Sequence, residues 1–175
     1  IEVPILDGSS ENFVELIEKA GIVEQDSPRH TLKITKRVAV DLGGRRMSVE
    51  PADRFEIECV IDLPHPFIKR QAFTYVPDNG SFGREIASAR TFGFTHEIEM
   101  LRKANLAQGG SLDNAIVLTG DGMLNETPLR FADEFVRHKI LDIIGDLALL
   151  GMPVQGKFTA EKSGHAPKRN DKEPK

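Results

Sequence analysis

The sequence of 175 residues has one cysteine, no tryptophan and no apolar run near the roughly 20 residues that cross a bilayer. A single cysteine excludes an internal disulfide framework and suits a reducing compartment. Charge is close to balanced, with 23 Lys and Arg against 27 Asp and Glu and a formal net charge of −4. Electrostatics therefore gives no reason to expect nucleic acid, and no membrane span is expected.

Several common functional motifs are also absent. The sequence contains no G-x-G-x-x-G loop, no P-loop and no C-x-x-C pair. Cys59 stands in FEIECVID in phase with Phe55, Ile57 and Ile61, which indicates a packed core thiol and not a reactive one. The first residues, IEVPILDGSS, carry no Met and no signal-peptide character, so we expect a chain cut in mid-domain.

The order of the predicted elements indicates an α+β fold, as a two-layer α/β sandwich. Strands and a Gly43-Gly44 hairpin are expected early in the chain, and long helices later. A polar segment broken by Pro28 is the candidate domain boundary, and 167–175 is Pro-rich, charged and expected to be disordered. The expected strands are 1–6, 31–40, 45–51, 54–62, 71–76, 114–118 and 154–162, and the expected helices are 11–20, 82–94, 96–106 and 129–150.

The helix expected at 129–150 has an unusual polar side. His138, Asp142 and Asp146 stand four residues apart and so form one stripe, nearly opposite a broad apolar face. A solvated stripe with charged residues would be the ordinary interpretation. Phe135, Gly145 and Leu149 also fall on this side, however, and they fit solvent poorly. We therefore expect another surface to pack against it.

Five residues could carry chemistry. His138 and Asp142 at i and i+4 can reach one zinc ion, although such pairs more often form a surface hydrogen bond or ion pair. Asp146 could orient a second histidine or simply be solvated. His165, in the loop sequence SGHA, could act as a general acid, but a loop histidine is more often without a role. Thr91 could donate a hydroxyl hydrogen bond or cap a helix end.

Several motifs resemble one family. ARTFGF, GGSLDNAIV, LRFADEFVRHKILDIIGDLALLG and FTAEKSGHA, in this order and spacing, resemble the zinc-dependent UDP-3-O-acyl-N-acetylglucosamine deacetylase of lipid A biosynthesis. The opening IEVPILDGSS with its following helix resembles the end of the first domain of that enzyme. The resemblance runs from residue 1 to about His165 and covers rather more than half of the family's length.

The resemblance implies a division of the chain and a set of roles. It implies the tail of a first domain at 1–27, a second deacetylase domain at 28–166 and a small βαβ insert at about 93–118. His138 and Asp142 would be ligands to a catalytic Zn²⁺, while Asp146 and His165 would form a charge-coupled pair and Thr91 would bind the oxyanion. Lys139, Lys162 and Phe92 would contact the UDP-sugar substrate. The residues expected along a passage for the acyl chain are Ile98, Ala107, Ser111, Leu112, Ala115 and Val117.

The resemblance also implies what lies outside this chain. The remaining zinc histidine and the glutamate that activates water belong to the first domain of the family, which is expected as a partner. The enzyme would work in the cytoplasm of Gram-negative bacteria, in lipopolysaccharide synthesis, and this chain alone would be inactive. The alternative is a fragment or non-catalytic module that binds the UDP-sugar or the acyl chain without turnover, since catalytic zinc normally has three protein ligands.

Overall fold

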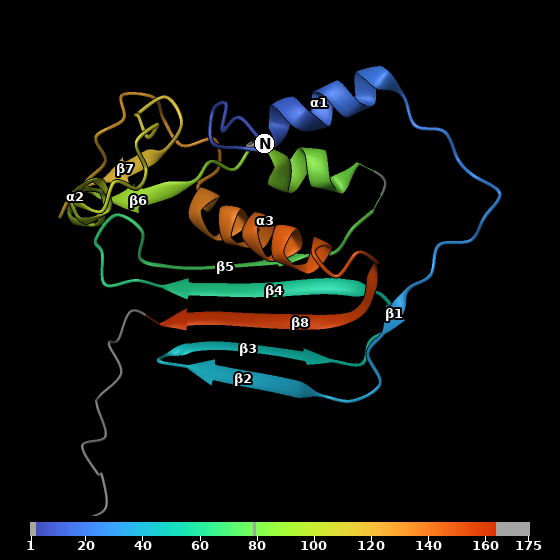
Figure 1. Ribbon diagram of the computed structural model, residues 1–175. Coiled ribbons are helices and arrows are strands. Elements are labelled where there is room, and N and C mark those ends of the chain that lie inside the picture. Colours follow the sequence, from blue (N-terminus) through green and yellow to red (C-terminus); the bar gives the residue numbers. More distant parts are fainter. Residues whose placement is uncertain (1–2, 79, 164–175) are drawn as a thin grey trace, which may run out of the picture.

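The computed structural model describes residues 3–78 and 80–163, without the side chains of 162 and 163. Helices and strands form two layers, with α3 lying over one face of the main sheet (Figure 1). The helices are α1 (Glu11–Ala20), the π-helix η1 (Gly83–Ala87), α2 (Thr95–Lys103) and α3 (Glu134–Ala148). The strands are β1 (Leu32–Lys33), β2 (Val38–Leu42), β3 (Arg45–Glu50), β4 (Phe55–Asp62), β5 (Arg70–Tyr75), β6 (Phe92–Phe94), β7 (Ile116–Leu118) and β8 (Val154–Ser163).

The main sheet is mixed, with strand order β2-β3-β8-β4-β5 and the short β1 paired with the start of β8. The strand β8 runs antiparallel to β3 and parallel to β4. Along β4 the side chains alternate, and Ile57, Cys59 and Ile61 are buried toward α3. This arrangement confirms the predicted α+β sandwich.

The core between the sheet and α3 depends on the first half of that helix. Phe135, Val136 and Ile140 are completely buried, and η1 packs on α3 from another side. The prediction that Phe135 would face a surface outside this chain is wrong, because its ring packs against Phe92 at 4.9 Å between centroids. Leu149, in contrast, is 87% exposed, so the end of this face is open in the chain as it stands.

The predicted insert is present as a βαβ unit. The strands β6 and β7 pair in parallel, in the register Phe92 with Ile116 and Phe94 with Leu118, and α2 connects them. A parallel pair needs such a crossover, since a tight turn cannot return the chain in the same direction. The sequence FGREIASARTFGF, expected as one helix, instead divides into η1 and β6.

Other local predictions had mixed outcomes. The hairpin of β2 and β3 turns at Gly43 and Gly44, whose φ angles of 60° and 81° need glycine in both positions. Residues 3–6 are outside any strand, because no described strand pairs with them. The expected strand 31–40 is split because β1 pairs with β8 whereas β2 pairs with β3.

The domain division at residue 28 stays a prediction, and the tail 167–175 lies outside the described residues. Within the part of the chain that the structure describes, the helices are too short or too polar to traverse a bilayer.

Candidate functional site

The polar stripe of α3 lines an open hollow of about 660 Å³. His138, Asp142 and Asp146 contribute from the helix, and Thr91 contributes from the segment before β6. The opposite wall comes from the chain before and within α1. This polar hollow brings together four of the predicted site residues, and its remaining lining residues are Pro4, Ile5, Gly8, Ser9, Ser10, Phe13, Leu141 and Gly145.

His138 is held in one orientation at the floor of the polar hollow. Its imidazole is buried, and Nδ1 lies 2.9 Å from the backbone oxygen of Ala89. Since a carbonyl oxygen can only accept, Nδ1 carries the proton and donates. Burial lowers the pKa of His138 below 6.5, although the nearby Asp142 carboxylate opposes this shift. The neutral ring therefore turns an unprotonated Nε2 toward Asp142.

The distance between Nε2 of His138 and Oδ1 of Asp142 is 3.4 Å. This is long for a hydrogen bond, and in the neutral ring both atoms are acceptors that face each other without a donor between them. Two ligands at about 2.0–2.1 Å from a tetrahedral zinc stand about 3.4 Å apart. The pair thus fits the nitrogen and oxygen ligands of zinc. In the described residues no group of three His, Cys, Asp or Glu side chains could hold a metal ion.

The other predicted partners of this pair are only partly visible. Asp146 is exposed one turn further along α3 and lines the polar hollow. His165 lies outside the described residues, so its pairing with Asp146 stays a prediction. The backbone of Lys162 is in β8 between Ile61 and Arg45, while the position of its side chain is not described.

The backbone of Thr91 is fixed from two sides. Its N–H donates to the oxygen of Gly8 at 2.8 Å, and its carbonyl accepts from the N–H of Ile116 at 2.8 Å. The first bond connects it to the chain before α1, and the second leads into β7. Thr91 therefore lies between η1 and β6, which does not support a role in capping a helix end.

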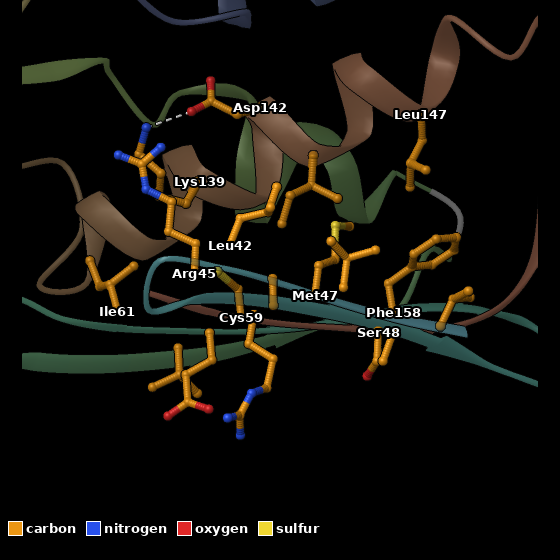
Figure 2. A pocket seen from close by; sticks show the side chains of 18 of the residues that line it. Leu42, Arg45, Met47, Ser48, Cys59, Ile61, Lys139, Asp142, Leu147 and Phe158 are labelled. Carbon is orange, nitrogen blue, oxygen red and sulfur yellow. Dashed lines mark hydrogen bonds and ion pairs between the residues drawn. The ribbon is translucent and has the colours of Figure 1, made fainter. Parts of the chain in front are cut away.

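A second depression, the sheet groove, lies between α3 and the face of β2, β3 and β8 (Figure 2). It has a volume of about 770 Å³ and is mainly apolar, with Met47, Cys59 and Leu147 among its lining residues. Lys139 and Asp142 lie at one end and form an ion pair of 2.6 Å. Of the predicted substrate contacts, Lys139 and Phe92 are neighbours, since Nζ of Lys139 lies 5.1 Å from the ring centroid of Phe92.

The insert contains a third space, the apolar cavity, with a volume of about 910 Å³. All the residues predicted along an acyl passage line it, namely Ile98, Ala107, Ser111, Leu112, Ala115 and Val117. Pro4, Ile5 and Thr91 line both the apolar cavity and the polar hollow. The two spaces therefore adjoin at Thr91.

Sequence reasoning missed some residues that shape this site. Pro4 and Ile5 were expected in a strand, yet they form a wall shared by the two spaces. The carbonyl oxygen of Gly8 accepts the hydrogen bond of the Thr91 N–H. Gly8 has a φ of +80°, and only the turn sequence DGSS pointed to a turn at this position. Glu134 is fully buried in the first turn of α3, where a charged residue would ordinarily be solvated.

The comparisons with known proteins agree with one another. The family model described as LpxC, UDP-3-O-acyl N-acetylglycosamine deacetylase, matches residues 1–170. A curated UDP-3-O-acyl-N-acetylglucosamine deacetylase of Myxococcus xanthus (strain DK1622) is 52% identical over 165 residues, which are 94% of this chain and 52% of the relative. Those of Oleidesulfovibrio alaskensis and Pseudomonas entomophila are 51% and 50% identical, over 94% of this chain and 54% and 55% of their own lengths. The chain spans about half the length of these relatives. It belongs to the UDP-3-O-acyl-N-acetylglucosamine deacetylase family.

Proposed function

We propose that this chain supplies one side of the active site of a zinc-dependent amide hydrolase. The reaction is deacetylation of UDP-3-O-acyl-N-acetylglucosamine to UDP-3-O-acyl-glucosamine and acetate, the committed step of lipid A biosynthesis. The observation that carries the proposal is the position of Thr91, which lines both the polar hollow with His138 and Asp142 and the apolar cavity of the insert. A substrate with an acetamide next to a long acyl chain needs these two environments side by side.

The residues of the polar hollow divide the hydrolytic work. His138 and Asp142 would hold Zn²⁺, which when bound supplies Lewis-acid activation of water and of the acetamide carbonyl. The hydroxyl of Thr91 donates a hydrogen bond to the negative charge that develops on the carbonyl oxygen. His165 gives a proton to the departing amine, and Asp146 orients its ring. Support for the last two roles comes from the family resemblance.

The remainder of the substrate has a place on the same face. Lys139 lies over the ring of Phe92 and, with Lys162, supplies positive charge for the diphosphate. The acyl chain lies in the apolar cavity along α2, where Ala115 and Val117 border the space. These assignments place the sugar near Thr91, between the charged and the apolar ends.

Further polypeptide is needed to complete the site. The third zinc ligand and the glutamate base are assigned to the first domain, which we propose covers the open end of the polar stripe. Leu16 and Ile17 of α1 are 61% and 59% exposed, and Leu149 of α3 is 87% exposed. Exposed large apolar side chains of this kind are typical of a surface that another polypeptide covers. The single, buried cysteine fits the reducing cytoplasm.

A non-catalytic binding module is the second candidate. The two-ligand half-site favours it, because zinc held by only two protein groups is weakly bound. Such a module would bind the UDP-sugar or the acyl chain through the same apolar cavity and would release no acetate.

Acetate release from UDP-3-O-acyl-N-acetylglucosamine separates the two candidates. It is measured with zinc for the chain alone and for the chain combined with the first domain of a relative. We expect turnover only in the combination and its loss in the His138→Ala variant. Tight substrate binding without turnover in the combination would instead establish the binding module.

A further inference from the structure

Glu134 is completely buried at the start of α3, and its carboxylate accepts hydrogen bonds on both oxygens. Oε1 accepts from the backbone N–H of Arg90 and from Nε of Arg90, both at 2.9 Å. Oε2 accepts from the backbone N–H of Arg130 at 2.7 Å and from Nη2 of Arg90 at 3.2 Å. The carboxylate thus joins two backbone segments that approach α3 from different parts of the chain.

Arg90, the partner of this carboxylate, is also almost completely buried, with 9% of its side chain exposed. Its guanidinium donates to Oγ1 of Thr127 at 3.2 Å and to the oxygen of Pro128 at 2.8 Å. Buried ion pairs commonly contribute no more to stability than well-packed apolar residues of the same volume. The pair instead fixes the relative orientation of the segments that it joins, because each donor meets one defined oxygen atom.

Each of the two residues next to Arg90 in the sequence is connected with the proposed site. The preceding residue, Ala89, accepts the Nδ1 proton of His138 through its carbonyl oxygen. The following residue, Thr91, lines the polar hollow together with His138. Glu134 and His138 are one helical turn apart on α3. Two successive turns of the helix therefore bind two successive residues of one segment, since Glu134 binds Arg90 and His138 binds Ala89.

We propose that Glu134 is a positioning residue, which fixes the Ala89–Thr91 segment against α3 and thereby sets the Thr91 hydroxyl and the His138 ring relative to each other. The catalytic part of this inference rests on the proposed function, whereas the geometric part does not. Glu134 itself touches neither the polar hollow nor the apolar cavity.

The decisive variant is Glu134→Gln. It preserves the size of the side chain, but its amide NH₂ would face the Arg130 N–H and the Arg90 guanidinium, which are donors only. The matched control is Asp133→Asn, because Asp133 is the adjacent residue and forms an ion pair of 2.6 Å with Arg137 without touching Arg90. Both changes remove one negative charge at the start of the same helix.

The first measurement tests, in the metal-free chain, whether the Thr91 backbone and the His138 ring keep their positions. Hydrogen exchange of the Thr91 amide and the ¹⁵N shifts of the His138 ring report two groups that Glu134 does not contact. For Glu134→Gln we expect exchange of the Thr91 amide to accelerate about tenfold, and part of the His138 rings to lose the Nδ1 proton to Nε2. Asp133→Asn should leave both signals as in the unmodified chain.

The second measurement reads catalysis in the combination of this chain with the first domain. A displacement of about 1 Å at a reacting group lowers turnover by about 10²-fold, so we expect kcat to fall 10–100-fold with KM changed less than about threefold. Glu134→Asp, which restores the charge but is one methylene shorter, should not recover kcat if reach is what matters.

The two measurements separate the possible failures. Unchanged Thr91 exchange and His138 shifts in a folded Glu134→Gln chain would overturn the positioning role, whatever the activity. Altered geometry with full kcat would overturn the proposed function for Thr91 and His138 and leave the structural link standing. If Glu134→Gln does not fold, Arg90→Lys carries the same test, because it preserves the charge and removes the fork that binds both oxygens.

Discussion

The carbonyl oxygen of Gly8 accepts the amide proton of Thr91 at 2.8 Å, which attaches the turn before α1 to the centre of the candidate site. Gly8 has a φ of +80°, and a Cβ at this position would lie 2.0 Å from the backbone oxygen of Asn114. The turn therefore meets the insert so closely that no side chain fits between them.

We expect Gly8→Ala to lower the free energy of unfolding by about 2–4 kcal/mol, since it adds a backbone clash to the strain of a positive φ. Gly21→Ala is the control, because Gly21 has a φ of +83° and no atom within 4 Å of the added Cβ. It should lose only about 1 kcal/mol. Urea denaturation measures both, and equal losses would show that the contact with Asn114 contributes nothing.

The metal assignment predicts that substitutions along the stripe of His138, Asp142 and Asp146 affect zinc binding to different extents. His138→Ala and Asp142→Ala should each weaken zinc binding by the chain at least about tenfold, because each removes a ligand. Asp146→Ala removes a charge from the next turn without removing a proposed ligand, so its effect should be small. Competition with a chromophoric chelator measures the affinities. Three equal losses would indicate general attraction of cations to the acidic stripe and would contradict a defined site.

The turn before α1 should also respond to pH through Asp7. Burial raises the pKa of Asp7, but hydrogen bonds from Arg130 and Ser9 outweigh it and hold the pKa below 3.8. The carboxylate therefore contributes stability above about pH 3.8, which is lost as pH falls through the lower folded-state pKa. Asp7→Asn should cost about 1 kcal/mol near pH 7 and less near pH 3. Urea denaturation at both pH values tests this, and a difference independent of pH would contradict it.

The acyl passage can be tested by narrowing the apolar cavity. Ala115 lines this cavity, so Ala115→Trp should weaken binding of ligands with long acyl tails and leave short-tailed ligands nearly unchanged. Asp113→Trp adds the same ring at an exposed position of the insert that does not line the cavity, and it should affect neither class. Calorimetric titration of the two ligand classes measures the effect. Equal weakening of both classes by Ala115→Trp would mean that the insert only packs on itself.

Local patterns predicted the elements well where a segment keeps one periodicity throughout. The alternation in FEIECVID predicts β4 with its buried face, and Gly43-Gly44 predicts the hairpin turn. The stripe of His138, Asp142 and Asp146 was visible from helical spacing, and the structure places all of them on one hollow.

Contacts between distant segments could not be predicted in this way. The ring of Phe92 that covers Phe135 comes from another element, so the hydrophobic pattern of the helix alone placed Phe135 on an open face. Burial of Glu134 depends likewise on Arg90, because only a partner that supplies matching donors allows a carboxylate to be buried. The sequence of β8 does not indicate that it pairs in parallel with β4. The alternation of its side chains suits a parallel and an antiparallel neighbour equally well.

The position of β8 at the centre of the sheet has a consequence for how the protein is made. The hairpin of β2 and β3 and the hairpin of β4 and β5 leave the ribosome first, and β3 and β4 do not pair with each other. Until residues 154–163 emerge, each hairpin presents an unpaired edge, and such edges attract other nascent chains. Because the strand that joins them lies so far along the sequence, closure of the sheet should be slow. Yield in the cell should therefore depend on chaperones that shield the two edges during synthesis.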